Sequence, residues 1–337
     1  MKKIFFSFLA VAAIASCAKT EAVYNEMDSE IKLAPVAAKQ TKANVLGAID
    51  GTEYPTAENF DVYGYWKNVG AGETYTDGQS YFGGAVEFTN KGNYWGGVTP
   101  YYWPKNGALR FAAYSPADLD LAHEQVGDVF SVDGYSQPSN TADTWDFLVA
   151  PTSESYTAMT AAENVSVVFE HALSWITLQV KTKDAAAEGV FTIKSVKING
   201  VNTTADFEAS MLDQEMVQYE SWTNWGAPAE YVVFDGVQGV TAEPTVIENT
   251  TAGTLVIPQA TTNVTVVFDQ KGVNGTMDMT DMVVNLDLVL DQDNEPWRPG
   301  YHYIYTLVFG LDEILINPSV DLWNEYIVGE LDPEAIN

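Results

Sequence analysis

The sequence predicts an all-β protein made of β-sandwiches, and three features carry this prediction. Apolar and polar residues alternate through many short segments, which is the pattern of half-buried β-strands. Gly, Asn and Pro stand between these segments, where tight turns need them. Segments with a helical period are short, and the best candidate for a helix is residues 119–125. Many short strands joined by such turns favour β-sandwich architecture.

The length, composition and charge of the chain limit the kinds of protein it can be and the partners it can bind. Its 337 residues suffice for two domains of ordinary size, and its 46% apolar and 12% aromatic residues exclude a disordered chain. The 46 acidic residues outnumber the 16 basic ones, which gives a net charge of −30. Such a surface repels nucleic acid and anionic lipid, so we expect neither as a partner.

The N-terminus has the features of an export signal. Lys2 and Lys3 precede an apolar segment, residues 4–15, which is shorter than the roughly 20 residues needed to cross a bilayer. The Ile-Ala-Ser sequence before Cys17 resembles a bacterial lipobox, where the signal is cut before a cysteine that then receives lipid. We expect residues 1–16 to be a lipoprotein signal peptide and Cys17 to carry lipid; an ordinary secretory signal is the alternative. Cys17 is the only cysteine, which leaves no thiol for a disulfide.

The segment that follows, residues 17–42, is rich in small and polar residues and weakly patterned. We expect it to be a tether or pro-segment between the lipid and the fold. The alternative is that part of it, such as residues 22–33, pairs as a strand and is later removed.

Strand-like segments follow this tether. Polar and apolar residues alternate in residues 61–66, and residues 104–107 end in Asn-Gly, which suits the positive φ of a hairpin turn. Residues 199–200 repeat the Asn-Gly signal. Further strands are expected within residues 80–89, 94–104, 108–116, 143–151, 190–201, 231–234, 253–258, 264–268, 282–290 and 301–309.

Residues 165–180 mark the middle of the chain. Their apolar side chains occupy odd positions up to Trp175 and even positions from Ile176 onward. A change of phase within a strand requires a bulge or a tight bend, which we place at residues 172–174. The stretch is expected to be the first long strand of a second domain.

Catalytic and metal-binding motifs are missing from the sequence. His123, His171 and His302 lie far apart, and His171, beside the expected bend, is interpreted as a buried structural histidine. No nucleophile, phosphate-binding or dinucleotide-binding motif occurs. Residues 291–295 superficially resemble a calcium loop, but Pro296 stands where that loop needs glycine, so we expect a solvated hairpin tip. The sequence predicts no catalytic residues, no metal, no cofactor and no enzymatic activity.

Aromatic residues are frequent between residues 63 and 103, and two interpretations are open for them. The favoured one is that they fill the core and the space between sheets. Alternatively, Trp66 and Trp103 belong to a sugar-stacking surface, which would make the protein a glycan-binding surface lipoprotein. A glycoside hydrolase that uses paired carboxylates is a much weaker alternative.

Short motifs occur in a fixed order along the chain. They are Tyr-Trp-Pro at residues 102–104, Leu-Arg-Phe-Ala-Ala-Tyr-Ser-Pro at 109–116, Asp-Phe-Leu-Val-Ala at 146–150, Val-Val-Phe-Glu-His-Ala-Leu-Ser at 167–174, Ser-Val-Lys-Ile-Asn-Gly-Val at 195–201, Leu-Val-Ile-Pro-Gln at 255–259, Trp-Arg-Pro-Gly at 297–300 and Val-Asp-Leu-Trp at 320–323. Behind a lipobox, and covering nearly all of the chain after it, this series resembles the fimbrillin-like pilins of the Bacteroidetes.

The resemblance implies a fold and a mode of assembly. It implies two tandem transthyretin-like β-sandwich domains, which we place at residues 43–160 and 161–337. It also implies that a trypsin-like protease removes the N-terminal segment with its first strand, and that a donor strand, usually C-terminal, from the next subunit fills the groove. In such strand addition the backbone ladder supplies affinity, and alternate side chains fill pockets.

Two segments are candidates for this assembly. No arginine precedes Arg110, so Lys39 and Lys42 are the candidate cleavage sites, with Lys42 favoured; an uncleaved anchor or accessory subunit stays open. Pro318 is expected to interrupt the ladder of the donor segment. The donor residues share one parity and are Ile314, Ile316, Val320, Leu322, Tyr326 and Val328.

The sequence therefore predicts a structural or adhesive subunit of a cell-surface pilus, exported as an outer-membrane lipoprotein. Other pilin subunits are its expected partners, the outer membrane holds it through the lipid, and host or bacterial surface ligands are further candidates.

Overall fold

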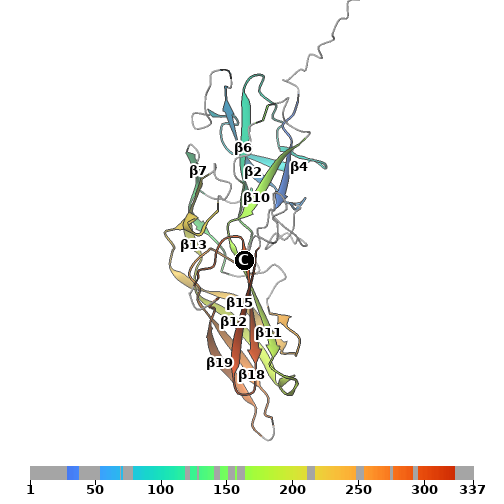
Figure 1. Ribbon diagram of the computed structural model, residues 1–337, viewed down its shortest axis with the longest axis vertical. Helices are drawn as coiled ribbons and strands as arrows, with labels where there is room; N and C mark the ends of the chain where they lie inside the picture. Colours follow the sequence, from blue (N-terminus) through green and yellow to red (C-terminus); the bar gives the residue numbers. More distant parts are fainter. Residues whose placement is uncertain are drawn as a thin grey trace, which may run out of the picture.

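The structure is a computed structural model, and it describes residues 29–37, 54–68, 70, 79–117, 122–126, 129–139, 145–150, 156–157, 164–210, 217–247, 254–273, 276–290 and 295–322. Strands make up nearly all of its regular structure, so the all-β prediction is confirmed. Two short 3₁₀ turns, Ala185–Ala187 and Tyr219–Ser221, accompany them, and within the described residues no helix is long and apolar enough to cross a membrane. The molecule is elongated, with its sheets gathered toward the two ends (Figure 1).

A sheet that closes into a ring occupies one end of the molecule (Figure 1). The ladder runs from β2 through β4, β5, β1, β10, β9 and β6, and β6 pairs again with β2, while the short β3 extends β2 beside β4. Closure leaves the ring without the unpaired strand edge that an open sheet exposes. Its strands are β1 (Leu33–Ala37), β2 (Phe60–Lys67), β3 (Gln79–Ser80), β4 (Val86–Asn90), β5 (Trp95–Gly97), β6 (Ala108–Ser115), β9 (Leu148–Ala150) and β10 (Val165–His171).

Alternate side chains of these strands fill the inside of the ring. In β10, Val165, Val167 and Phe169 are buried, whereas Ser166 between them is exposed. Phe60 meets Phe169 edge to face, with ring centroids 5.3 Å apart. The two-residue period of the strands thus gives the ring an apolar core.

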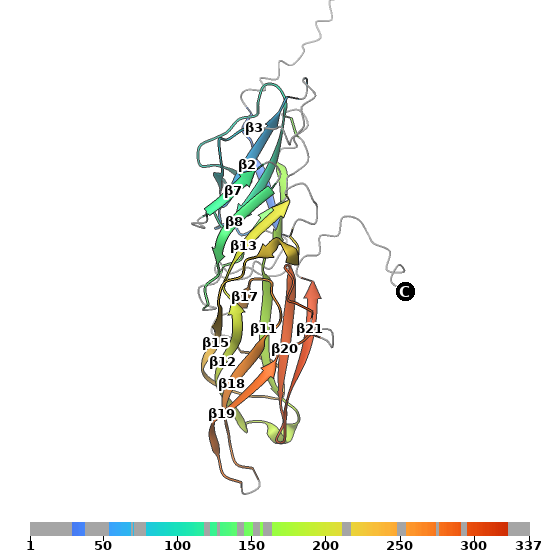
Figure 2. The ribbon, with the colours of Figure 1, turned by 90° about the vertical axis from the view of Figure 1, so that its left-hand side faces the viewer.

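Two further sheets pack face to face at the other end, as Figure 2 shows. One sheet has the order β16-β11-β20-β21, with β17 beside β11, and the other has the order β15-β12-β18-β19. The strands of the two sheets are β11 (Ser174–Thr182), β16 (Thr245–Val246), β17 (Thr254–Val256), β20 (Tyr301–Phe309), β21 (Ile314–Leu322), β12 (Phe191–Asn202), β15 (Pro228–Gly239), β18 (Asn263–Gln270) and β19 (Met279–Asp287).

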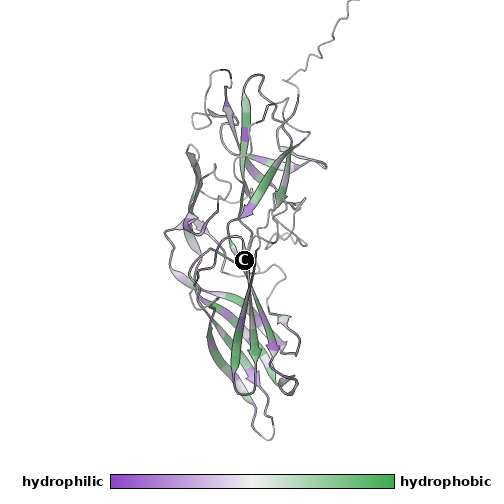
Figure 3. Cartoon of the chain, viewed as in Figure 1, coloured by the Kyte–Doolittle hydropathy of each residue, from purple (hydrophilic) through white to green (hydrophobic). Residues whose placement is uncertain are grey.

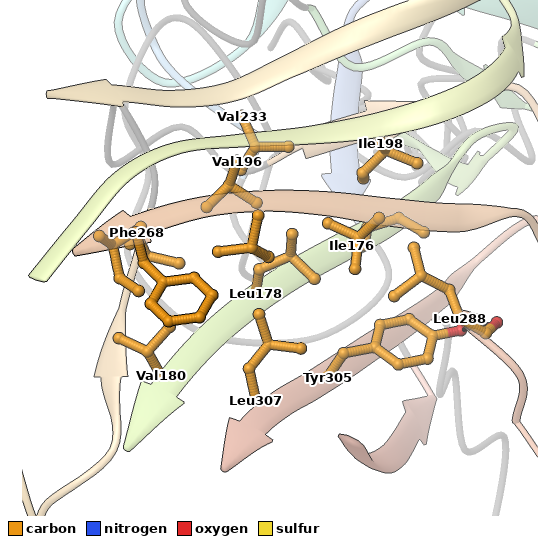
Figure 4. Close-up of a cluster of buried hydrophobic side chains, with 14 of the residues drawn as sticks. Ile176, Leu178, Val180, Val196, Ile198, Val233, Phe268, Leu288, Tyr305 and Leu307 are labelled. Carbon is orange, nitrogen blue, oxygen red and sulfur yellow. Dashed lines mark hydrogen bonds between the residues drawn. The ribbon is translucent and has the colours of Figure 1, made fainter. Parts of the chain in front are cut away.

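Side chains from both sheets make one apolar core between them (Figure 4). Leu178 and Leu307 come from one sheet, Val196 and Phe268 from the other, and the first three are fully buried. In Figure 3 apolar residues follow the strands of this sandwich and of the ring. The β-sandwich prediction holds for this end of the molecule.

A small fourth sheet joins the two ends. Its order is β14-β13-β8-β7, and β13 follows β12 after a single intervening residue. Its core combines Tyr114 from the outside of the ring with Phe207, Trp222 and Leu255. The division at residue 160 stays a prediction, but this core contains residues from both sides of it. The strands are β7 (Ala122–Val126), β8 (Val129–Ser136), β13 (Thr204–Ser210) and β14 (Trp222–Thr223).

The predicted bend in residues 165–180 lies at Ala172 and Leu173, between β10 and β11. The stretch is not one strand of a second domain, because β10 belongs to the ring and only β11 to the sandwich. The change of phase has a physical cause: Phe169 points into the ring core, and Ile176 points into the sandwich core.

Two local predictions were wrong. Residues 122–126 form β7 rather than a helix, because pairing with β8 outweighs a short helical period. Asn199-Gly200 forms an irregularity inside β12, where the register shifts between Ile198 and Val201, rather than a hairpin turn. The positive φ expected of the glycine is present at 68°.

Tyrosine hydroxyls are buried at several points of these cores. Burial raises the pKa of Tyr303 to about 12, and burial raises the pKa of Tyr231 and Tyr305 further. Burial also raises the pKa of Tyr114, and its hydrogen bond to Asp61 (2.6 Å) adds to the effect. These phenols stay protonated in the fold at a pH where an exposed tyrosine loses its proton.

Alkali should therefore destabilise the protein in a defined window. The unfolded chain releases the proton of Tyr303 near pH 10 and the folded chain near pH 12, so the free energy of unfolding should fall between these values. Tyrosinate absorbance and far-ultraviolet circular dichroism should change together above pH 10. Protein in concentrated urea is the control; titration of all 18 tyrosines near pH 10 without loss of structure would contradict the expectation.

Candidate functional site

The first strand of the chain completes the ring. On one edge β1 pairs in parallel with β10, with Leu33 opposite Val165, and the Val165 amide donates to the Lys32 carbonyl at 2.9 Å. On the other edge Leu33 lies opposite Trp95 of β5. Just before β1, the Ile31 amide donates to the carbonyl of Tyr101 at 2.8 Å. The strand is therefore held by backbone pairing on both sides.

The side chains of this segment alternate between the ring core and the outside. Ile31 and Leu33 are 0% exposed and Pro35 is buried, whereas Lys32 and Ala34 are half-buried. Burial of a Leu or Ile side chain contributes about 1.5–3 kcal/mol. Residues 29–37 thus act as a plug that is both paired and buried.

Polar contacts on the outside of the ring hold β1 less strongly than its buried side chains do. The Tyr94 hydroxyl donates to a Glu30 carboxylate oxygen at 3.0 Å, and the Lys32 ammonium lies 4.9 Å from the centre of the Tyr94 ring. The hydrogen bond to Glu30 raises the pKa of Tyr94. At an exposed site such contacts contribute only about 0.5–1 kcal/mol, so the buried side chains dominate the hold on β1.

Pro35 fits the ladder without losing a hydrogen bond. Backbone N–H and C=O groups alternate in direction along a strand. The backbone groups of Lys32 and Ala34 therefore point toward β10, and those of Leu33 and Pro35 point toward the side of β5. The pairing with β5 starts at Trp95, opposite Leu33, and Pro35 lies beyond that end. The missing N–H of Pro35 therefore has no partner to lose.

The predicted donor segment lies in β21, at the edge of the sandwich. Within the described residues β21 pairs only with β20, where Ile316 lies opposite Leu307 and Pro318 opposite Tyr305. Ile314 and Ile316 pack against the sandwich core, and Val320 is 43% exposed. The shared parity of Ile314, Ile316 and Val320 thus places them on one face of the strand.

The expected interruption at Pro318 was wrong, because the register continues through it to Leu322. The hairpin starts with a hydrogen bond of 2.8 Å from the Gly310 amide to the Glu313 carbonyl. Directly opposed pairs then alternate between bonded and non-bonded, which makes Pro318 and Tyr305 a non-bonded pair. The nitrogen of Pro318 therefore points away from β20.

The sequence profile of the fimbrillin-like family matches residues 19–323. The chain belongs to this family. Its fold is similar to a fimbrial protein from Bacteroides vulgatus ATCC 8482, with a TM-score of 0.55, 12% identity, and coverage of 88% of this chain and 100% of that one. It is also similar to a candidate cell adhesion protein from Bacteroides uniformis ATCC 8492, with a TM-score of 0.54, 18% identity, and coverage of 87% and 99%. A search of curated proteins finds no match.

Some predicted site residues of this fimbrillin-like protein lie outside the described residues. These are Cys17, Lys39, Lys42, Tyr326 and Val328. Lipidation and cleavage therefore stay predictions. The structure does place β1 directly before the two lysines in the sequence, so a cut at either one separates β1 from the rest of the chain.

The two tryptophans proposed for a sugar-stacking surface serve the fold of the fimbrillin-like protein. Trp103 is only 5% exposed and meets Phe111 edge to face at 5.9 Å, so it is part of the ring core. Trp66 is half-buried, and its indole N–H donates to the Asn106 carbonyl at 2.8 Å. Trp103 is thus excluded from a binding surface by its burial.

Two of the histidines, His171 and His302, make contacts that support the fold. His171 is fully buried and shares a hydrogen bond of 2.8 Å with Asp146, beside the bend. His302 stacks on Trp175 with ring centroids 3.6 Å apart, and its Nε2 lies 2.9 Å from the Thr177 hydroxyl. In the described part of the chain, no cluster of His, Cys, Asp and Glu could hold a metal ion.

The residues that sequence reasoning underestimated are those of β1. The alternation of Ile31, Leu33 and Pro35 was present in the sequence, but the surrounding composition favoured a tether. The alternative of a strand in residues 22–33 overlaps the observed strand Leu33–Ala37 only at Leu33.

The precursor should depend on β1 for stability. Leu33→Ala should lower the free energy of unfolding by about 2–5 kcal/mol, because it leaves a cavity in the ring core. Ala34→Ser, on the outside of the same strand, should change it by less than about 0.5 kcal/mol. Urea unfolding of the two variants tests this, and equal effects would show that β1 is not part of the folded core.

Proposed function

We propose that this fimbrillin-like protein is a structural subunit of a cell-surface pilus, polymerised by β-strand addition after proteolysis removes β1. One observation carries the proposal. A short N-terminal strand fills a closed ring, and two lysines, Lys39 and Lys42, follow it at once. Family membership and the fold shared with a fimbrial protein support the same function.

Loss of β1 creates a site for a strand. It leaves the backbone of β10 without its β1 partner along Val165–Phe169, and it exposes the apolar side chains that Ile31 and Leu33 cover. Unpaired strand edges readily accept another strand. An incoming segment with alternate apolar residues restores both the ladder and the buried surface, which is the general basis of strand addition.

Export and assembly are linked in this proposal. Cys17 carries the lipid and anchors the precursor in the outer membrane. A cut after Lys39 or Lys42 removes the lipid and β1 together, because both lie on the N-terminal side of it. Subunits thus become free and able to polymerise in one step, and the partners are other pilin subunits. The polymer then presents the subunit to host or bacterial surface ligands.

The N-terminus of protein taken from the cell surface tests the proposal. Polymerised subunits should begin at Gln40 or Ala43, and a Lys39→Gln/Lys42→Gln double variant should remain a lipidated monomer. Lys67→Gln, a change in β2 away from the processing region, is the control and should polymerise normally. Polymers whose subunits all retain a lipidated Cys17 would rule out assembly by loss of β1.

A further inference from the structure

Three of the eight methionines lie close together where β19 begins. They are Met277, Met279 and Met282, in a Met-X-Met-X-X-Met sequence. The hairpin of β18 and β19 carries them at the end of the sandwich that is far from the ring (Figure 2). Met277 is 86% exposed and Met279 is 41% exposed, and Met282 is only partly buried against the sandwich core. The three thioethers are therefore within reach of a solute.

A β-bulge places Met279 and Met282 on one face of β19. Regular alternation would put them on opposite faces, because three positions separate them. In the ladder with β18, however, Met282 lies opposite Phe268 and Met279 lies opposite Gln270. Three steps along β19 thus match two steps along β18, which is the geometry of a bulge. Gln270 lies in turn opposite the buried Phe191, so this face is the one turned toward the core.

Met277 continues the row of thioethers. It precedes Met279 by two residues, as Gly272 follows Gln270 by two. A Cβ atom on Gly272 would lie 3.0 Å from the carbonyl carbon of Met277, so the two arms of the hairpin still adjoin there. The two-residue period of a strand then gives Met277 and Met279 the same face. Gly272 has no side chain to cover that face, which agrees with the exposure of Met277.

The carboxylates between the methionines are engaged elsewhere. Asp281 has a φ of 55°, its amide donates to the Asp269 carboxylate at 2.9 Å, and its own carboxylate accepts from Lys194 at 2.5 Å. These contacts fix the bulge from the face opposite the methionines. The Asp278 carboxylate accepts from the Gly272 amide at 2.7 Å. The ligands that the core-side face offers are thus neutral sulfur atoms.

We propose that Met277, Met279 and Met282 bind one soft monovalent cation, Cu(I) or Ag(I), through their three sulfur atoms. Thioethers are soft ligands that select Cu(I), whereas hard cations such as Ca²⁺ and Mg²⁺ require oxygen. The site belongs to the sandwich and β1 belongs to the ring, so this inference does not rest on the proposed function.

Geometry and charge both suit such a cation. Met279 and Met282 are two ladder positions apart, which corresponds to about 7 Å along the strand. Methionine side chains have three rotatable bonds, so sulfur atoms at this spacing can converge on one ion. Neutral ligands leave the positive charge of the ion uncompensated at the site, and the net charge of −30 on the chain favours its approach.

Titration with Ag(I), followed by calorimetry and native mass spectrometry, tests the site. The full chain should carry Cys17→Ser in every sample, because a thiol would compete for the ion. One Ag(I) should bind per chain, and excess Ca²⁺ should not displace it. Met279→Leu should weaken binding at least about tenfold, since loss of a ligand's outer partner alone costs about 10–100-fold. Met277→Leu/Met279→Leu/Met282→Leu should abolish it, while Leu keeps the side-chain volume and hence the fold.

Two controls separate this site from other ligands. Met211→Leu/Met216→Leu removes two methionines that are also close in sequence, and Asp278→Asn removes the nearest carboxylate; both variants should still bind one Ag(I). Bound Ag(I) should also protect Met277 from conversion to the sulfoxide by peroxide, as read by mass spectrometry. Failure of the unaltered chain to bind Ag(I), binding that survives the triple substitution, or loss of binding in Asp278→Asn would overturn the proposal.

Discussion

The ring closes only while a strand lies between β10 and β5. Every other neighbour in the ring is joined by a ladder of its own, but these two strands meet through β1 alone. Without it, the amide of Val165 loses the Lys32 carbonyl and the core loses Ile31 and Leu33. The proposed function requires that this strand be removed and replaced.

Proline restricts pairing at the edge of the sandwich. A free edge strand with alternating apolar residues pairs with many partners, and Pro318 limits this because its missing N–H lies on the free edge of β21. At the edge of the other sheet, β19 is irregular at Asp281, which has a φ of 55° and bonds to Lys194 at 2.5 Å.

The strands that the sequence predicted well are those whose pattern is local. In β20, for example, Tyr303, Tyr305 and Leu307 alternate over a long segment, and all are buried as expected. The family resemblance, based on short ordered motifs, is confirmed by the family profile. The bend at Ala172 was predictable for the same reason, since a change of phase is visible in neighbouring residues.

What the sequence did not determine depends on pairing between distant segments. The sheet to which β10 belongs is set by β1 and β9, and nothing in its own residues distinguishes the ring from the sandwich. The burial of Trp103 depends on Phe111 and the segment before β1, which meet only in the fold. The alternation in β1 was too short to stand out.

Hydrogen exchange of the β10 amides tests the central claim most directly. The Val165 amide faces β1, and β1 pairs with β10 along residues 165–169, so peptides covering residues 164–169 report whether a strand occupies that position. They should be protected in the precursor, exchange rapidly once the N-terminal segment is cut and removed, and be protected again in the polymer. Protection that persists through cleavage, or that does not return on polymerisation, would contradict replacement of β1 by a strand from another subunit.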